Sequence, residues 1–207
     1  AIAISPGVPL QEPLVVDVAA RGIPVVGDVE LFAQALGDQE TSTKVIGITG
    51  SNGKSTVTTM VGELCKAVGL NAVVAGNIGL PVLDALTESQ AKPPDVYVLE
   101  LSSFQLETTS SLALDAATML NLTEDHLDRY ASMDAYAAAK ARIFAHCRHQ
   151  VLNRDDSYSM AMLRPGSPTG YFGRSAPLGH GHWGMSVLRG EAWLFEDRQP
   201  LMPVAEL

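Results

Sequence analysis

Short apolar runs alternate with helix-like segments through the middle of the chain. The runs are rich in Val, Ile, Leu and Ala, and they cover residues 45–49, 72–75, 96–99, 117–120 and 150–153. Such runs are typical of buried strands, and strands that alternate with helices form parallel sheets. We therefore predict an α/β fold with a parallel sheet that helices cover on both faces.

Two segments between these runs have the periodicity of helices. Apolar residues recur every three or four positions over residues 57–68, and Gly69 follows as a C-terminal stop. A second helix is expected over residues 133–144, where Tyr136 and Phe144 are among the apolar residues. Both helices would lie between neighbouring strands of the sheet.

The two ends of the chain have other patterns. Towards the C-terminus, Pro and Gly separate short segments, and residues 183–187 and 192–195 flank Arg189-Gly190. This pattern predicts a small antiparallel hairpin in addition to the parallel sheet. Residues 1–4 are expected to form a short strand that leads into the loop Ser5-Pro6-Gly7. Because the chain begins inside a strand, we expect it to be a piece of a longer protein.

Composition narrows the function classes. The 14 Lys and Arg residues against 23 Asp and Glu give a formal net charge of −9, which argues against nucleic-acid binding. The chain is 46% hydrophobic and 18% charged, as in a globular protein, and no apolar run has membrane-spanning length. Cys65 and Cys147 have no metal-ligand spacing, which favours a reduced, cytoplasmic setting. We expect a monomer with neither nucleic-acid nor membrane partners.

A glycine-rich loop follows the first strand of the alternating region. Gly50-Ser51-Asn52-Gly53-Lys54-Ser55-Thr56 leads directly into the first helix, so backbone N–H groups and Lys54 can surround phosphate oxygens. Ser55 is placed to offer its hydroxyl to Mg²⁺. The pattern GxxxxGK[ST] would need a glycine at Ile48, so this is a variant loop. A turn with a solvated lysine is the alternative, but it leaves the order of these residues unexplained.

Polar residues follow two further strands. Glu100 ends the run 96–99 and should emerge where α/β proteins bind ligands, as a metal ligand or as an exposed carboxylate. The segment from Asn121 to Tyr130 contains His126 among several carboxylates, which could hold a second divalent cation or orient a substrate. Its alternative is a helix N-cap at Thr123 or Asp125, followed by a salt-bridged turn.

Two more residues stay ambiguous by pattern alone. Lys140 lies among alanines on the second helix, where a lysine is usually a solvated surface charge. Asn77 follows the second strand in Gly76-Asn77-Ile78-Gly79, either as a turn residue or as a ligand contact.

Three of these motifs together resemble the central ATP-binding domain of the Mur ligases. They are Gly50-Ser51-Asn52-Gly53-Lys54-Ser55, Glu100 followed by Ser102 and Ser103, and Asn121-Leu122-Thr123-Glu124-Asp125-His126-Leu127-Asp128. Three further runs resemble the members that join D-glutamate to UDP-N-acetylmuramoyl-L-alanine: Val29-Glu30-Leu31-Phe32, Gly76-Asn77-Ile78-Gly79-Leu80-Pro81, and Leu99-Glu100-Leu101-Ser102-Ser103-Phe104-Gln105-Leu106-Glu107-Thr108-Thr109. The last of these runs is long and specific.

The resemblance implies a set of site residues. ATP phosphates would bind Gly50, Ser51, Asn52, Gly53, Lys54, Ser55 and Thr56. One Mg²⁺ would be held by Ser55 and Glu100, and a second by His126 and Lys140, a lysine that CO₂ carbamylates in this family. Lys54, His126 and Lys140 would be the catalytic residues. The UDP-muramoyl substrate would contact Ser5, Asn77, Ser102, Gln105 and His126.

The implied chemistry is amide ligation through an acyl phosphate. The alanyl carboxylate attacks the γ-phosphate of ATP, and the amine of D-glutamate then displaces phosphate. Residues 1–26 would be the end of a uridine-nucleotide-binding domain with its linker, and residues 27–207 a truncated central domain without the C-terminal domain that binds D-glutamate.

Two other functions stay open from the sequence. The chain could belong to another Mur ligase or to a folylpolyglutamate synthase, against which the run from Glu100 to Thr109 argues. It could also be a non-catalytic P-loop nucleotide-binding module, which would leave the clusters at Glu100 and His126 without a reason.

Overall fold

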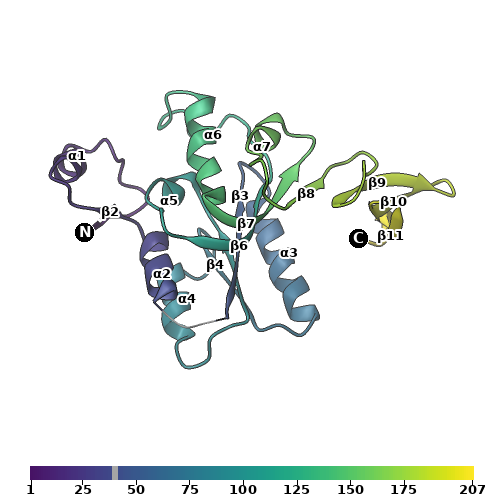
Figure 1. Cartoon of the computed structure of the whole chain (residues 1–207), viewed down its shortest axis with the longest axis horizontal. Coiled ribbons are helices and arrows are strands. Elements are labelled where there is room, and N and C mark those ends of the chain that lie inside the picture. The colour runs from purple at the N-terminus through teal and green to yellow at the C-terminus, as the bar shows by residue number, and fades with distance from the viewer. Residues whose placement is uncertain (39–41) are drawn as a thin grey trace.

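A mostly parallel sheet forms the centre of the molecule (Figure 1). The computed structural model describes residues 1–38 and 42–207, within which nine strands join in the order β11-β10-β9-β8-β7-β6-β3-β5-β4. Their bounds are β3 (Lys44–Thr49), β4 (Ala72–Gly76), β5 (Val96–Glu100), β6 (Ala113–Met119), β7 (His146–Asn153), β8 (Thr169–Phe172), β9 (His182–Leu188), β10 (Glu191–Glu196) and β11 (Gln199–Pro203). Neighbours from β4 to β9 are parallel, whereas β9, β10 and β11 are antiparallel. The predicted α/β fold with an antiparallel C-terminal element is confirmed.

Helices cover the two faces of this sheet unequally. The helices of the sheet domain are α2 (Asp28–Gly37), α3 (Lys54–Ala67), α4 (Val82–Glu88), α5 (Ser103–Glu107), α6 (Met133–Ala141) and α7 (Ser157–Ala161). A large core joins α2, α4, α5 and α6 to one face, where the rings of Phe32 and Tyr97 meet edge to face at 5.1 Å. On the other face α3 packs through Val57 and Val61 onto a smaller core that includes Val98.

Helix α3 places fewer apolar residues in the core than its periodicity suggests. Met60, Leu64 and Val68 are 54%, 63% and 77% exposed, because the helix rests on the sheet along its Val57–Val61 side. Gly62 faces Val74 so closely that an added Cβ would collide with the Val74 side chain. The absence of a side chain there lets helix and strand approach.

Several boundaries differ from the prediction, among them the start of β7, which lies at His146 and not at Gln150. The helix over 133–144 is α6 to Ala141, and a 3₁₀ turn, η1 (Arg142–Phe144), continues it. Strand β6 begins at Ala113, earlier than its apolar run, even though it includes Asp115. This carboxylate accepts a hydrogen bond from the Val45 N–H at 3.1 Å and pairs with Lys44 at 3.1 Å. A charged residue is therefore tolerated at the start of a central strand.

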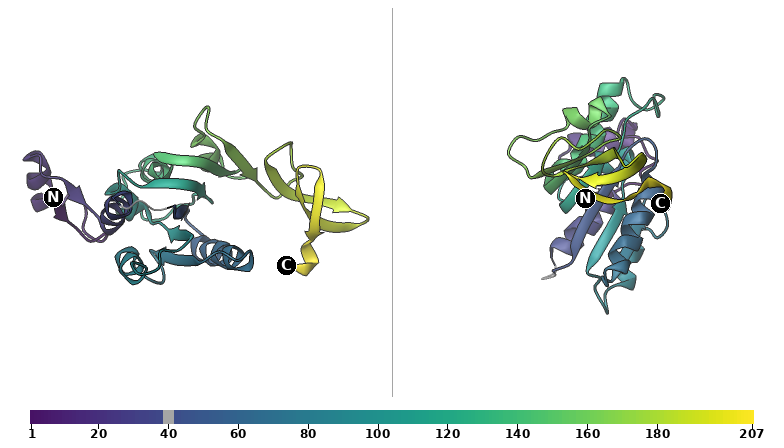
Figure 2. Two further views of the ribbon diagram at one scale, coloured as in Figure 1. Left: turned by 60° about the horizontal axis from the view of Figure 1, so that its bottom comes forward. Right: turned by 90° about the vertical axis from the view of Figure 1, so that its right-hand side faces the viewer.

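The N-terminal segment and strands β9 to β11 lie at opposite ends of the molecule (Figure 2). The N-terminal segment contains a two-stranded parallel sheet, β1 (Ile2–Ala3) with β2 (Val25–Val26), and helix α1 (Pro13–Ala20). The chain ends in a 3₁₀ turn, η2 (Val204–Glu206). Nowhere in the described residues is a helix both long and apolar enough to cross a membrane.

Candidate functional site

The predicted phosphate loop connects β3 to α3. Gly53 is the N-cap of α3 with a φ of 80°, in the left-handed region that favours glycine. A side chain at Gly50 would press against the Leu120 Cβ at 3.1 Å. Among the described residues no side chain caps α3, and its first turn has no acidic residue, so the first N–H groups of the helix are available to bind an anion.

The end of β6 braces this loop. The Asn121 side chain accepts a hydrogen bond from the Asn52 N–H at 2.9 Å and donates one to the Asn52 carbonyl at 3.0 Å. The Asn52 amide donates to Thr123 Oγ1 at 3.1 Å, and the Ser51 hydroxyl accepts from the Thr123 N–H at 3.1 Å. Asn121 thus holds the loop through the backbone of Ser51 and Asn52, and the N–H groups at the start of α3 are left for a ligand.

Lys54 and Ser55 lie at the start of α3. The Lys54 ammonium folds back and donates to the Ser51 carbonyl at 2.9 Å. Ser55 and Thr56, the next two residues of the helix, are exposed. The first turn therefore presents one cation and two accessible hydroxyl residues beside the loop.

Glu100 ends β5 as a buried carboxylate with one unsatisfied oxygen. Its side chain is 1% exposed, and Oε1 accepts a hydrogen bond from the Asn77 amide at 2.8 Å. Glu100 Oε2 is buried and has no hydrogen-bond partner among residues 1–38 and 42–207. An unpaired buried carboxylate oxygen is costly, and a bound cation would offset that cost. The burial excludes the alternative of a plain exposed glutamate, and the free oxygen fits a cation.

Lys140 is a buried amine at the base of the phosphate loop. It is 1% exposed and donates to the Gly50 carbonyl at 2.8 Å and to Thr49 Oγ1 at 3.4 Å. Burial, and then the charge of Lys54, lower the pKa of Lys140 to about 7, against the opposing effects of Asp125 and Glu100. The alternative of a solvated surface lysine is wrong.

His126 lies in an exposed turn. Its backbone φ is 54°, its ring is 4.8 Å from the Phe104 ring, and Nε2 is 3.4 Å from Asp125 Oδ2. His126 and Lys140 both lie against Tyr136, at 6.0 Å between ring centroids and 4.9 Å from Nζ to the ring centroid. Neither Thr123 nor Asp125 caps a helix, because α6 begins later with Ser132 as its N-cap.

Within the described ranges, no three His, Cys, Asp or Glu side chains converge as metal ligands. The donors available at this edge of the sheet are the Glu100 carboxylate, hydroxyl groups and one imidazole. Such a set fits Mg²⁺, which keeps several waters and is usually completed by phosphate oxygens rather than held in an all-protein cage.

The predicted substrate residues fall into two kinds. Asn77 and Ser5 are exposed at the surface. Ser102 is partly buried and Gln105 is 3% exposed, and together they form the capping box of α5. The Gln105 amide also donates to Asp28 Oδ2 at 3.1 Å, so it joins α5 to the start of α2.

Sequence reasoning gave no role to Arg129, although it belongs to the motif around His126. The structure places its guanidinium between the N-terminal loop and α5. Tyr136 was assigned only to the helix core, yet its ring contacts both His126 and Lys140. Neither role has a spacing pattern that could have revealed it.

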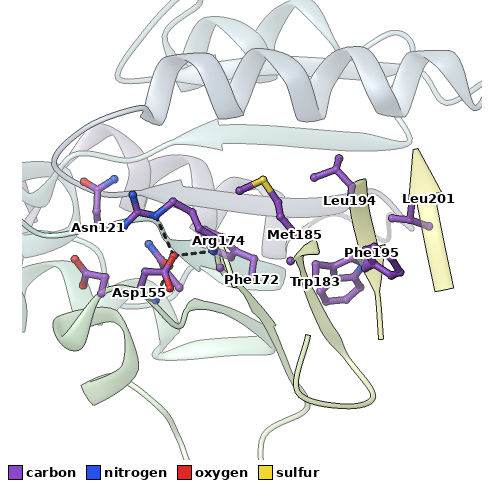
Figure 3. A pocket seen from close by; sticks show the side chains of 13 residues that line it. Asn121, Asp155, Phe172, Arg174, Trp183, Met185, Leu194, Phe195 and Leu201 are labelled. Atoms are coloured by element: carbon purple, nitrogen blue, oxygen red, sulfur yellow. Dashed lines mark hydrogen bonds and ion pairs between the residues drawn. The ribbon is translucent and has the colours of Figure 1, made fainter. Parts of the chain in front are cut away.

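A cavity of about 490 Å³ opens beside the phosphate loop (Figure 3). Asn121 and the Asp155–Arg174 ion pair lie at one end of it, and Met185, Trp183, Leu194, Phe195 and Leu201 lie towards the other. Asn121 is thus shared by the phosphate loop and the cavity.

Comparisons with known proteins agree on one family. The Mur ligase middle domain matches residues 48–174. The chain is 59% identical over 206 residues to a UDP-N-acetylmuramoylalanine–D-glutamate ligase of Methylobacillus flagellatus, covering 100% of this chain and 44% of the relative. It is 53% identical over 215 residues to the ligase of the same name from Nitrosomonas europaea, at 100% and 45% coverage.

Solved structures share the fold at low sequence identity. A UDP-N-acetylmuramoyl-L-alanyl-D-glutamate–2,6-diaminopimelate ligase superposes with a TM-score of 0.67 at 19% identity, covering 96% of this chain and 51% of the other. The MurF ligase from Thermotoga maritima in complex with ADP gives 0.61 at 18% identity, with 93% and 52% covered. The chain spans less than half the length of the curated relatives described above.

Proposed function

The chain belongs to the Mur ligase family, and we propose that the whole protein is the ATP-dependent ligase that joins D-glutamate to UDP-N-acetylmuramoyl-L-alanine in peptidoglycan precursor synthesis. Two relatives named for this reaction, at 59% and 53% identity over the whole chain, support the proposal. The long run from Glu100 to Thr109 supports the choice of acceptor.

The observation that carries the proposal is the unpaired Glu100 Oε2 at the strand end next to the phosphate loop. A nucleotide-binding module needs only the loop and its lysine. A phosphoryl-transfer site also needs a cation held against the nucleotide, since the transferred group carries charge that must be neutralised. The buried carboxylate supports a cation position beside the loop.

The ATP phosphates are proposed to bind the backbone of residues 50–56. Lys54 would leave the Ser51 carbonyl and contact the β- and γ-phosphates. Ser55 and Glu100 would hold one Mg²⁺, and His126 and Lys140 a second. When bound, Mg²⁺ withdraws negative charge from the phosphate oxygens.

Lys140 is proposed to be carbamylated. Its neutral amine would add to CO₂ to form an N-carboxylate and release one proton, which turns a buried cation into an anionic oxygen ligand. The chain supports this step in two ways. The amine is buried among neutral hydrogen-bond acceptors, and its pKa of about 7 makes the neutral form abundant at neutral pH.

The proposed reaction has two steps. The alanyl carboxylate attacks the γ-phosphorus of ATP, and the bond from this phosphorus to the β–γ bridging oxygen breaks. ADP departs, and an acyl phosphate is formed. The amine of D-glutamate then attacks the acyl carbon, loses a proton and expels phosphate. The residues of this chain position the reactants and balance charge, as is general for phosphoryl transfer.

The muramoyl nucleotide is proposed to contact Ser5, Asn77, Ser102, Gln105 and His126. Residues 1–26 would belong to a uridine-nucleotide unit, and the residues that bind D-glutamate would lie in the part of the protein outside this chain. The enzyme would act in the cytoplasm, because ATP and nucleotide-linked precursors are cytoplasmic compounds, and we propose that it acts as a monomer.

Phosphate release by the full-length protein tests this proposal. With ATP, Mg²⁺ and UDP-N-acetylmuramoyl-L-alanine, we expect release that depends on D-glutamate and not on L-glutamate, glycine or L-lysine. Release with a different acceptor would keep the family and change the substrate. Release without any acceptor would support the nucleotide-binding module instead.

A further inference from the structure

Arg129 joins three segments that are far apart in the sequence. Its backbone belongs to the His126 turn, where the Arg129 N–H donates to the His126 carbonyl at 2.9 Å. Its guanidinium donates to the carbonyl oxygens of Pro6 and Val8 at 3.2 and 3.4 Å, and to Glu107 Oε2 at 2.9 Å. The N-terminal loop, the end of α5 and the His126 turn therefore meet at one side chain.

The surroundings of this guanidinium are nearly dry. The Arg129 and Glu107 side chains are 12% and 15% exposed. The guanidinium carbon lies 4.2 Å from the centre of the Phe104 ring, and that ring also contacts His126. A planar fork of donors can serve two carbonyls and a carboxylate while it stacks on an aromatic face, whereas a lysine ammonium cannot.

The N-terminal loop depends on this side chain for its place. Within residues 5–8 the Val8 N–H donates to the Ser5 carbonyl at 2.9 Å, and the Gly7 N–H to Ser5 Oγ at 3.4 Å. These bonds shape the loop but do not attach it to the sheet domain. Among the described residues, the hydrogen bonds that attach it come from Arg129.

We propose that Arg129 is a positioning residue that holds the Ser5 loop against the His126 turn and thereby sets the muramoyl-nucleotide site. This inference rests on the proposed function, in which Ser5 and His126 both contact that substrate. In this proposal Arg129 acts through the loop and not on the substrate, since three of its five N–H donors go to Glu107, Pro6 and Val8. Glu107 acts with it by holding the guanidinium in the orientation that reaches both carbonyls.

Steady-state kinetics of the full-length protein test the proposal. Arg129→Lys keeps the positive charge but loses the fork, and Glu107→Gln keeps the arginine but weakens its anchor. The matched control is Arg142→Lys, since Arg142 also donates to two backbone carbonyls, those of Leu106 and Thr109, both at 2.7 Å, but not to the N-terminal loop.

We expect Arg129→Lys to raise KM for UDP-N-acetylmuramoyl-L-alanine about tenfold, because one or two charge-assisted hydrogen bonds are lost. The kcat and the KM for ATP should stay within about threefold of the wild type, since the phosphate loop is untouched. Glu107→Gln should also raise KM for UDP-N-acetylmuramoyl-L-alanine, by a smaller factor. Arg142→Lys should leave all three constants unchanged.

Hydrogen exchange gives a second readout that needs no turnover. In the full-length protein, Arg129→Lys should speed exchange of a peptide covering residues 5–12 and leave the α3 peptide unchanged. The proposal would be overturned if Arg129→Lys lowered kcat and the affinities for ATP and for UDP-N-acetylmuramoyl-L-alanine equally. Unchanged exchange at residues 5–12 would also overturn it. A wild-type protein without D-glutamate-dependent turnover would refute the proposed function instead, while the exchange result would still report on the loop.

Discussion

The Asn121 side-chain amide makes two hydrogen bonds to the backbone of Asn52: it accepts from the Asn52 N–H at 2.9 Å and donates to the Asn52 carbonyl at 3.0 Å. This pair ties the phosphate loop after β3 to the end of the neighbouring strand β6. The loop is thus held from the side of β6, while among the described residues the first N–H groups of α3 have no side-chain cap and are left for a ligand. A glycine-rich loop that is fixed in advance loses less conformational entropy when it binds phosphate.

Removal of these two hydrogen bonds should weaken nucleotide binding. We expect Asn121→Ala in the full-length protein to raise KM for ATP about tenfold, because the loop must then be ordered by the nucleotide itself. The KM for the muramoyl nucleotide should change little. Asn71→Ala, at an exposed asparagine before β4, is the control. Equal KM values for ATP in wild type and Asn121→Ala would show that these hydrogen bonds have no part in binding.

Replacement of Glu100 by glutamine should lower turnover without lowering the stability of the unliganded protein. We expect Glu100→Gln to lower turnover at least a hundredfold, since a neutral amide holds a cation much less tightly beside the phosphates than a carboxylate does. The same variant should keep or raise the melting temperature without ligand, because it removes a buried charge whose Oε2 has no partner. A turnover assay checks the first part, and differential scanning calorimetry with and without Mg²⁺ and ATP checks the second. Glu63→Gln, at an exposed glutamate on α3, is the control, and a turnover as high as that of the control would exclude Glu100 as a cation ligand.

Lys140→Ala in the full-length protein should lose most activity and recover part of it with added short carboxylates such as acetate. The cavity left by the side chain would admit a small anion in place of the carbamate. Lys66→Ala, which removes an exposed lysine paired with Glu63 at 2.8 Å, should behave like the wild type. Mass spectrometry of native protein under ¹³CO₂ measures the modification directly. Full activity of Lys140→Ala would remove this residue from the site.

Glu30 should make stability depend on pH at the acid end. Burial raises its pKa, but hydrogen bonds from Ser110, Ser111 and Gln34 outweigh burial and lower it from 4.5 to about 2. A lowered folded-state pKa stabilises the fold above the unfolded value of 4.5, and that stabilisation is lost as pH falls towards 2.

The size of this contribution can be measured against Glu30→Gln. A shift of this size corresponds to roughly 3 kcal/mol at neutral pH. The difference in the free energy of unfolding between wild type and Glu30→Gln, from urea titrations, should be large at pH 7 and should shrink at pH 3. A difference that does not change with pH would contradict the role of the carboxylate.

Local chemistry made part of this architecture predictable from the sequence. The apolar strand runs and the glycine-rich loop are patterns of residues that are adjacent in the sequence. The parallel sheet, α3 and the antiparallel hairpin could therefore be predicted. The early start of β6 could not be, because Asp115 is satisfied by Lys44 and Val45 on another strand. The exposure of Met60 and Leu64 likewise depends on which side of α3 faces the sheet.

The sequence predicts which candidate site residues follow strand ends, but it does not predict their contacts. Lys140 has the pattern of a surface lysine, and only the tertiary structure buries it under the loop at Gly50. Arg129 has no pattern of its own, since its partners Pro6 and Glu107 are separated from it by 123 and 22 positions. Such long-range contacts arise from the order of strands in the sheet, which periodicity does not determine.

Oxygen transfer during turnover tests the central claim most directly. The full-length protein would be given UDP-N-acetylmuramoyl-L-alanine labelled with ¹⁸O in its alanyl carboxylate, together with ATP, Mg²⁺ and D-glutamate. An acyl phosphate predicts one ¹⁸O atom in the released phosphate and a new amide to D-glutamate in the product, both seen by mass spectrometry. Unlabelled phosphate, or phosphate released without D-glutamate, would contradict the account, because water and not the carboxylate would then have attacked ATP.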